Sequence, residues 1–302
     1  MEGEHVAKQL KTAFDDEWVC LKNVFVKPDT FNFKDQAERL DLAFRAMNKY
    51  LQGGGVFDPE KMKMPEKLME GLKEINKDLL KFKNISSYAS FQMWRGERAK
   101  PVKIIDKHSY LNKLNDITKT LVTFIDNSKH EIWIQNSYVV LTEAAEKALK
   151  RASDRGVKVL FHTNSGSSTD ALITQAFFMN DWKRILAEMK NARILVAPSA
   201  NERLHSKTFV FDRQITIVGS YNMDPLSEQV NSEVVAAIYD PSFGTMVSNR
   251  IADDAKVNVE YKVKVEPDGK ITPLVGPEDH NSQEIIKKMN MYRKFQWIRP
   301  LI

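Results

Sequence analysis

The chain has 302 residues, of which 42% are hydrophobic and 28% charged, a balance that excludes a disordered chain and indicates one or two globular units. Cys20 is the only cysteine, so neither an intramolecular disulfide nor a cysteine-based metal site can form. The net charge of +5 and the pI of about 9.0 favour polyanionic partners such as anionic lipid surfaces, nucleic acids or other phosphates.

Targeting and metal-binding signals are absent from the sequence pattern. Residues 1–20 lack the apolar core of a signal peptide, and nowhere do 18 apolar residues follow one another. We therefore expect no signal peptide and no transmembrane helix in this chain, and a location that is cytoplasmic or peripheral at a membrane surface. The six histidines lie far apart without a helical i, i+4 pair, so we expect no metal and no cofactor.

The first part of the chain is rich in lysine and in helical patterns. Apolar side chains recur at helical spacing in residues 35–52 and 65–83. A loop over residues 84–101 and a third helix over 109–127 are expected to follow. We predict that residues 1–115 form a helical region that precedes the catalytic part.

From about residue 130 the pattern changes to short strands that alternate with helices, which predicts a parallel sheet covered by helices. The expected elements are the strand 131–136, the helix 142–155, the strand 157–162, the helix 170–190 and the strand 193–197. Strands then follow one another more directly. The expected elements are the strands 205–212, 215–220 and 231–239, the helix 242–254, the strands 257–265 and 270–274, and a basic, aromatic helix over 283–302.

The residues that carry chemistry lie on the two strands joined by Arg213-Gln214, a link short enough for a hairpin. Residues i and i+2 of a strand share a face, so His205 and Lys207 are expected to point the same way. A two-residue turn would set Lys207 opposite Ser220 and His205 opposite Asn222. One side of the hairpin would then present an imidazole, an ammonium, a hydroxyl and an amide.

Such a face suits a phosphodiester. Lys207 offers a positive charge, and Ser220 and Asn222 offer neutral donors, to the non-bridging phosphoryl oxygens. A histidine can attack phosphorus or give a proton to the leaving alkoxide. Glu233, on the next strand, is expected to hold the imidazole of His205 by its other nitrogen. An in-line reaction needs two histidines on opposite sides of phosphorus, so a second half-site must come from elsewhere.

The pattern His205-x-Lys207-x4-Asp212-x6-Gly219-Ser220-x-Asn222 resembles, without a gap, the HKD motif of the phospholipase D superfamily. Its surroundings resemble the second catalytic half of bacterial cardiolipin synthases, especially the C type. The segments that carry this resemblance are 204–213, 218–225, 231–233, 134–138, 155–159, 163–165 and 168–170.

The resemblance covers roughly residues 115–300 and implies an α/β fold, with a phospholipase D-type mixed sheet flanked by helices. Residues 116–302 would form one catalytic half that ends in a basic helix. Two such halves meet at a pseudo-twofold axis, where one histidine forms phosphatidyl-histidine and the other is the acid and base.

The resemblance also assigns roles to individual residues. By position His205 resembles the acid and base, although in a homodimer either copy could take either role. Asp212 is expected to be structural, Glu233 to support a histidine, and Gly219 and Ser220 to support the site.

Four further residues follow strand ends and are candidates for a substrate pocket, because ligands gather at the carboxyl ends of parallel strands. They are Tyr138, Thr163, Asn164 and Ser165. Tyr138 could instead be a half-buried aromatic edge, and the other three could cap the helix 170–190. The basic, aromatic segment 283–302 could seat on anionic lipid or simply pack on the domain.

The sequence departs from two-motif members of the family, because no earlier HKD cluster is visible before residue 130. The leading hypothesis is a cardiolipin synthase-like phosphatidyltransferase or phosphodiesterase that acts on phospholipid at an anionic membrane surface. It would need a second HKD half, from a second copy or a separate chain, and we do not expect nucleic acid as its substrate. The alternatives are a homodimeric single-motif phosphodiesterase or nuclease, and an inactive half that serves as a partner or remnant.

Overall fold

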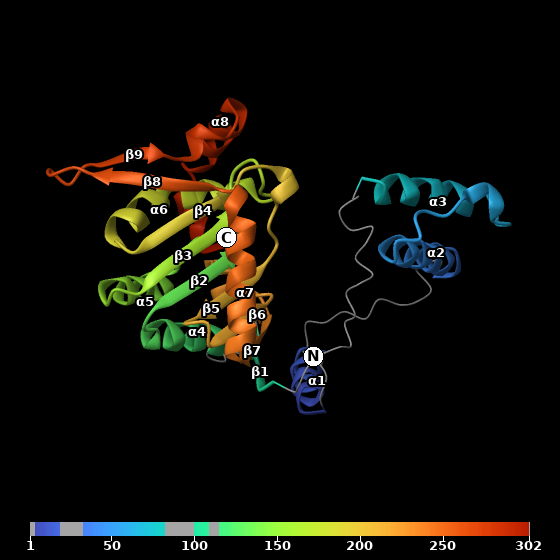
Figure 1. Ribbon diagram of the computed structural model, residues 1–302, viewed down its shortest axis with the longest axis horizontal. Helices are drawn as coiled ribbons and strands as arrows, with labels where there is room; N and C mark the ends of the chain where they lie inside the picture. Colours follow the sequence, from blue (N-terminus) through green and yellow to red (C-terminus); the bar gives the residue numbers. More distant parts are fainter. Residues whose placement is uncertain (1–3, 19–32, 82–99, 109–114, 302) are drawn as a thin grey trace. The chain divides into compact units, whose positions relative to one another are not determined.

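The structure, a computed structural model, describes residues 4–18, 33–81, 100–108 and 115–301. The chain divides into two compact units, one formed by residues 1–19 with 100–302 and the other by residues 20–99 (Figure 1). The boundary therefore differs from the one expected after residue 115, because a strand that precedes that residue belongs to the sheet of the larger unit.

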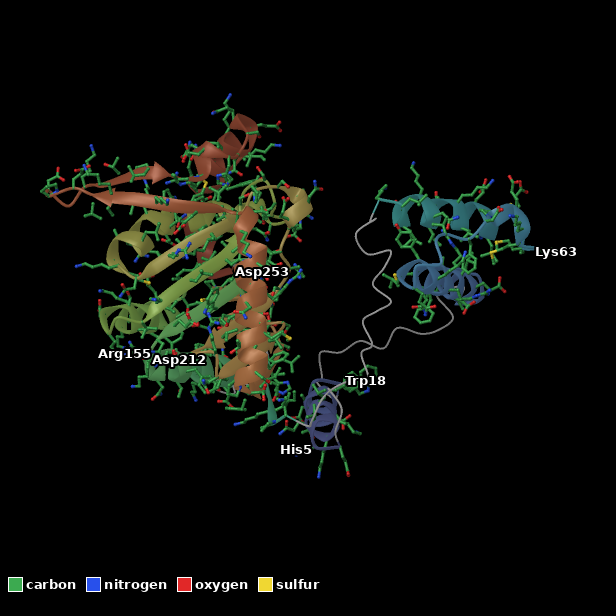
Figure 2. All side chains as sticks on the ribbon, in the orientation of Figure 1. His5, Trp18, Lys63, Arg155, Asp212 and Asp253 are labelled. Atoms are coloured by element: carbon green, nitrogen blue, oxygen red, sulfur yellow. The ribbon has the colours of Figure 1, made fainter. Side chains whose placement is uncertain are left out.

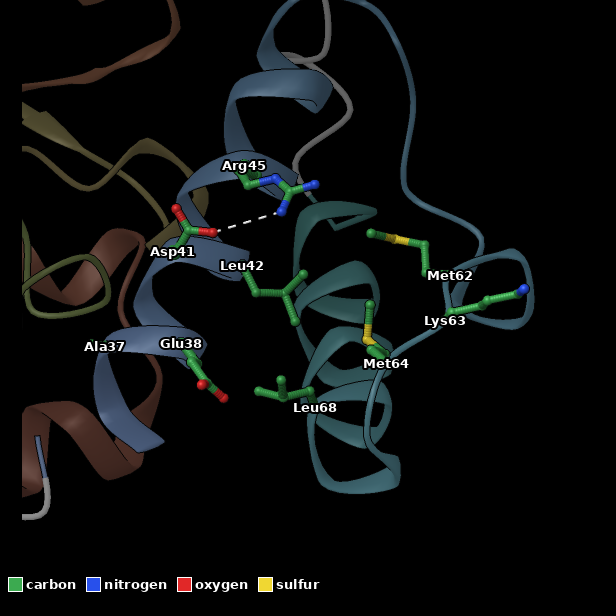
Figure 3. Close-up of a pocket in the computed structure, with 9 residues that line it drawn as sticks. All are labelled: Ala37, Glu38, Asp41, Leu42, Arg45, Met62, Lys63, Met64 and Leu68. Carbon is green, nitrogen blue, oxygen red and sulfur yellow. Dashed lines mark ion pairs between the residues drawn. The ribbon is translucent and has the colours of Figure 1, made fainter. Parts of the chain in front are cut away.

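The smaller unit is a pair of helices, α2 (Phe33–Leu51) and α3 (Glu66–Leu79). Their contact buries apolar side chains of both helices, namely Leu42, Ala46, Tyr50, Leu72 and Leu79. A groove of about 580 Å³ runs beside this contact, and Figure 3 shows the Asp41–Arg45 ion pair (3.7 Å) on its wall. The two regular elements expected in this region are thus confirmed.

The larger unit is built on a sheet in which the described residues supply nine strands, in the order β1-β7-β6-β5-β2-β3-β4-β8-β9. The strands are β1 (Val102–Lys107), β2 (Glu131–Asn136), β3 (Lys158–Asn164), β4 (Ala192–Ala197), β5 (Lys207–Phe211), β6 (Ile215–Gly219), β7 (Glu233–Tyr239), β8 (Val259–Val265) and β9 (Ile271–Val275). Strands β2, β3 and β4 are parallel, and the other neighbouring pairs are antiparallel. The predicted mixed sheet is confirmed.

Helices cover both faces of this sheet (Figure 1). The helices of the larger unit are α1 (Glu4–Trp18), α4 (Asp116–Asn127), α5 (Glu143–Asp154), α6 (Leu172–Glu188), α7 (Pro241–Asp254) and α8 (Gln283–Tyr292). Because side chains alternate along a strand, Phe209 and Phe211 join the core under α4, α5 and α6, whereas Val210 packs with Ile251 of α7.

Strand β1 was not expected from the sequence, and it forms one edge of the sheet beside β7. Helix α1 lies against this strand, and the side chain of Gln9 accepts a hydrogen bond from the backbone N–H of Ile104 (3.0 Å). The expected helix over 109–127 is described only from Asp116, since residues 109–114 lie outside the described part. None of the helices in the described ranges has the length and apolarity needed to cross a membrane.

The β5–β6 hairpin differs by one residue from its predicted register. Phe211, not Asp212, pairs with Ile215, so three residues form the loop instead of two. Asp212 and Arg213 adopt left-handed backbone angles (φ 49° and 55°), which let the chain reverse there. Continuing the ladder toward the start of β5 brings Lys207 opposite Gly219, and the predicted pairing of Lys207 with Ser220 is wrong.

Candidate active site

One edge of the sheet collects nearly all the residues of the HKD pattern. The strand directions bring the carboxyl ends of β1, β2, β3, β4 and β6 to the same edge as the amino ends of β5 and β7. We call this row of strand ends the site edge, as distinct from the outer strands β1 and β9. It carries Tyr138, His205, Lys207, Ser220, Asn222 and Glu233. The structure thus brings together, from four strand ends, residues up to 95 positions apart (233 − 138).

Lys207 is the first residue of β5, and only 9% of its surface is exposed. Its Nζ donates to Ser137 Oγ (3.2 Å) and to the carbonyl of His205 (3.4 Å), and lies 5.8 Å from the centre of the Tyr138 ring. Burial lowers the pKa of this ammonium, and the negative charges of Asp170, Glu233 and Asp224 oppose that shift. Two hydrogen bonds therefore hold the Nζ of Lys207 in a buried position at the site edge.

His205 lies just before β5 and its side chain is exposed. The preceding residue is held firmly, because Asn164 accepts from the N–H of Leu204 (2.9 Å) and donates to its carbonyl (2.9 Å). Within the part of the chain that the structure describes, the imidazole makes no hydrogen bond. An anchored backbone thus presents a ring that is open to a reacting phosphorus or a leaving oxygen.

Tyr138 and Asp170 form a second polar pair beside Lys207. The tyrosine hydroxyl donates to Asp170 Oδ1 (2.5 Å), and this bond is the largest cause that lowers the pKa of the carboxyl group; His205 and Arg203 add smaller effects. Burial, followed by the bond to Asp170, raises the pKa of Tyr138. Tyr138 is half-buried, and its ring lies beside the ammonium of Lys207 at the site edge.

Glu233 is buried and its carboxylate accepts three hydrogen bonds. They come from Ser220 Oγ, from Ser227 Oγ (2.8 Å) and from Asn231 Nδ2 (3.4 Å). The expected hydrogen bond from His205 is not among the bonds of this carboxylate to described residues. Its three hydrogen bonds all come from the segment between β6 and β7, so Glu233 fixes the turn that follows β6.

Lys107 is a residue of this edge that sequence reasoning missed. It is buried in β1 directly opposite Glu233, and its Nζ donates to the carbonyl of Asn231 (2.5 Å). Burial lowers the pKa of Lys107, and the charges of Glu233 and Glu228 oppose the shift. A lysine between apolar and acidic residues of a strand was the available signal, but the strand itself had not been predicted.

The turn after β6 positions Asn222 and depends on Gly219. A Cβ added to Gly219 would come within 2.2 Å of the carbonyl of Val234, so only glycine fits at this position. The N–H of Asn222 donates to Ser227 Oγ (3.1 Å). Its side-chain Oδ1 is buried and, among the described residues, has no hydrogen-bond partner. An amide oxygen only accepts hydrogen bonds, so the group of this side chain that can donate to a phosphate oxygen is Nδ2, which forms no hydrogen bond to a described residue.

Asp212 lies at the other end of β5, away from the site edge. Its two carboxylate oxygens accept from the backbone N–H groups of Lys129–Glu131, at 2.7, 2.8 and 2.9 Å. Figure 2 shows Asp212 at this end of the sheet, where Arg155 also lies. The carboxylate thus ties the hairpin to the start of β2, and its contacts are those of a structural residue.

Three of the four candidate pocket residues do not line an open surface. Thr163, Asn164 and Ser165 are fully buried. Thr163 and Asn164 bond to the carbonyl of Ser137, and Ser165 bonds within the loop that follows β3. They do not cap α6 either, since Ala171 precedes it without a side-chain cap. Their polar groups form hydrogen bonds with groups of the loops at the site edge.

The arrangement can bind and polarise a phosphate, because an exposed imidazole, a buried ammonium and an unpaired amide share one edge. Among the described residues, no three His, Cys, Asp or Glu side chains come together in a way that could hold a metal ion. At this edge Lys207 offers a positive charge and Asn222 a neutral amide donor to a bound phosphate.

Residues 121–255 match the family model described as "Cardiolipin synthase, PLD-like domain". Cardiolipin synthase C of Escherichia coli (strain K12) is 24% identical over 200 residues, which cover 62% of this chain and 41% of that protein. A cardiolipin synthase of Staphylococcus aureus (strain Mu50) is 32% identical over 136 residues, or 45% of this chain and 26% of that protein. The chain thus spans less than half the length of these relatives.

A solved structure shows the same fold. The phosphatidylserine synthase of Haemophilus influenzae Rd KW20 aligns with a TM-score of 0.50 and 12% sequence identity, covering 88% of this chain and 62% of that one. Residues 121–255 are therefore a phospholipase D-like domain, similar to that of the cardiolipin synthases.

Proposed function

We propose that this chain is one half of a cardiolipin synthase-like phosphatidyltransferase or phosphodiesterase, working through a phosphohistidine. The observation that carries the proposal is the exposed imidazole of His205, two residues from the buried ammonium of Lys207 at the site edge. The family match and the cardiolipin synthase relatives support the choice of a phospholipid substrate. The working location would be the surface of a membrane.

The proposed reaction needs two imidazoles on opposite sides of phosphorus. One ring nitrogen attacks phosphorus and forms an N–P bond while the bond to the leaving oxygen breaks, and that oxygen takes a proton from the second imidazole. The hydroxyl of an acceptor, phosphatidylglycerol or water, then attacks phosphorus and gives its proton back to the second imidazole. The N–P bond breaks, and both rings return to their starting state.

This chain would supply one imidazole and one set of charges. Lys207 and the free amide of Asn222 would bind the non-bridging oxygens, whose negative charge must be stabilised as the geometry at phosphorus changes. The second imidazole would come from another HKD half, either a second copy of this chain or a separate chain. By its place in the resemblance, His205 takes the acid and base role, and in a homodimer each copy can take either role.

The test is phosphodiesterase and transferase activity on phosphatidylglycerol vesicles and on DNA, for the wild type and His205→Asn, over a range of protein concentrations. His130→Asn is the matched control, since His130 is also exposed but lies at the opposite edge of the sheet. We expect lipid turnover that depends on His205 alone and rises more steeply than the protein concentration if two copies must meet.

Other results would redirect or overturn the proposal. Cleavage of DNA without turnover of lipid would replace it with the single-motif nuclease alternative. Equal inertness of wild type and His205→Asn, alone and with a chain that carries a first HKD half, would leave only the inactive half. If the active form is a homodimer, an acid-labile phosphatidyl group on the wild type, absent from His205→Asn, would identify the covalent intermediate.

A further inference from the structure

The C-terminal segment of the larger unit exposes apolar and basic side chains together. Helix α8 buries Ile286 and Met289 against α6. Beyond this contact, the exposed side chains of the segment 287–297 include five that are apolar or basic. They are Lys287, Met291 (49% exposed), Lys294, Phe295 (42%) and Trp297 (76%). We call them the tail patch.

The charge of the tail patch is not balanced by neighbouring carboxylates. Lys287 and Lys294 form no ion pair with any residue that the structure describes. The other charged groups of the segment are engaged: Lys288 pairs with Glu284 (2.6 Å), and Arg299 bonds to Asp181 (2.6 Å). The patch therefore combines uncompensated positive charge with three large apolar side chains, one of them a tryptophan.

The tail patch is tied to the site edge. Ser167, in the loop between β3 and α6, donates to Asn281 (2.9 Å) just before α8. Gly166 in the same loop lies so close to α8 that an added Cβ would come within 2.7 Å of Ile285. The same loop contains Asp170, which bonds to Tyr138 beside Lys207. The segment that carries the patch is thus anchored to a wall of the proposed active site.

We infer that the tail patch docks the larger unit on an anionic membrane surface and turns the site edge toward its lipids. Tryptophan and phenylalanine side chains favour the boundary between head groups and acyl chains. Lysines next to them gain energy from the negative potential of anionic lipids. A protein partner would instead favour a patch core depleted of lysine. The inference deepens the proposed function, on which the benefit of this orientation rests.

Docking is tested by co-sedimentation of the full chain with phosphatidylcholine vesicles, with and without phosphatidylglycerol. We expect binding only to the anionic vesicles, weakened by salt. Lys287→Gln with Lys294→Gln should weaken it about 30-fold, from about 1 kcal/mol for each lysine. Trp297→Ala should also weaken binding to the anionic vesicles, at every salt concentration. Lys158→Gln with Lys190→Gln is the matched control, because both lysines are exposed at the opposite edge of the sheet.

The outcomes separate docking from catalysis. His205→Asn should bind anionic vesicles as the wild type does, so a failure of catalysis alone would leave the docking inference standing. The inference is overturned if the wild type does not bind anionic vesicles, or if the tail and control pairs weaken binding equally. It is also overturned if the tail variants change the oligomeric state while vesicle binding stays the same. Thermal denaturation of each variant checks that folding is intact.

Discussion

The two ends of β5 belong to one sequence motif but are held in different ways. At the site edge, His205 is exposed and its imidazole has no hydrogen-bond partner among the described residues. At the opposite end, the carboxylate of Asp212 accepts three backbone hydrogen bonds. Side chains that react must stay accessible, whereas side chains that fix a strand must be satisfied. One short sequence pattern can therefore contain both a reactive side chain and a side chain that anchors the strand.

The largest expected effect is on activity, at the end of β5 that carries His205. His205→Asn should lower lipid turnover by about 10³-fold, because the proposed acid and base group is lost. The same change should move the free energy of unfolding by less than about 0.5 kcal/mol, since the ring makes no contact that folding needs. Steady-state assays and urea denaturation measure the two effects, and a large loss of stability would contradict the contrast between the two ends.

A second comparison sets exposed His205 against His162, which is buried in β3 on the face covered by α7. Burial lowers the pKa of His162 to about 4 from its ordinary 6.5. The unfolded chain therefore binds a proton between these two values while the folded chain does not. The free energy of unfolding should fall as the pH drops from about 6.5 to 4, by about 3 kcal/mol from this group.

Denaturation at several pH values measures this slope. His162→Gln keeps a polar group beside the amides of Gln135 and Asn258 but cannot take up a proton in this range. The variant should therefore lose this part of the pH dependence, while His130→Asn should keep it. An unchanged slope in the variant would show that another group is responsible.

At the anchored end the expected effect is on stability. Asp212→Ala removes the acceptor for the three backbone N–H groups at the start of β2 and should lower the free energy of unfolding by about 2 kcal/mol. The activity of the protein that remains folded should change little, because the site edge lies at the other end of the strand. A loss of activity as large as that of His205→Asn, without loss of stability, would contradict the structural role.

The smallest expected effect concerns the turn after β6. Ser220→Ala removes one of three donors to the buried carboxylate of Glu233 and should lower the free energy of unfolding by about 1 kcal/mol. Calorimetry at neutral pH would detect it. Ser206→Ala serves as the comparison, with a smaller expected change, because among the described residues this hydroxyl bonds only to Thr208 (2.8 Å).

The sequence was informative wherever local spacing decides the structure. The alternation of strands and helices predicted the parallel strands β2, β3 and β4, and the resemblance to the phospholipase D superfamily implied the mixed sheet. The HKD spacing predicted that His205, Lys207 and Asn222 share one side of a hairpin, in a register that the structure does not have. The hairpin register could not be read in this way. It depends on left-handed backbone angles at Asp212 and Arg213. Neither residue is a glycine, the residue type that adopts this conformation most readily, so the sequence did not indicate it.

Long-range contacts account for the other differences. The partners of Glu233 are set by the turn of residues 220–231, and strand β1 is recognisable only from its pairing with β7. Thr163, Asn164 and Ser165 were placed correctly at a strand end. Their burial follows from loops that approach from distant parts of the chain, and no local pattern encodes that approach.

The bond between Gln9 and Ile104 has a consequence for solubility. An edge strand offers unpaired backbone groups to which a strand of another molecule can attach, and such attachment starts aggregation. Here a side chain of α1 occupies one of these groups on β1, and the helix stands beside the strand. Helix α1 therefore shields the outer strand β1. A variant that lacks α1 would expose β1, a strand then prone to self-association.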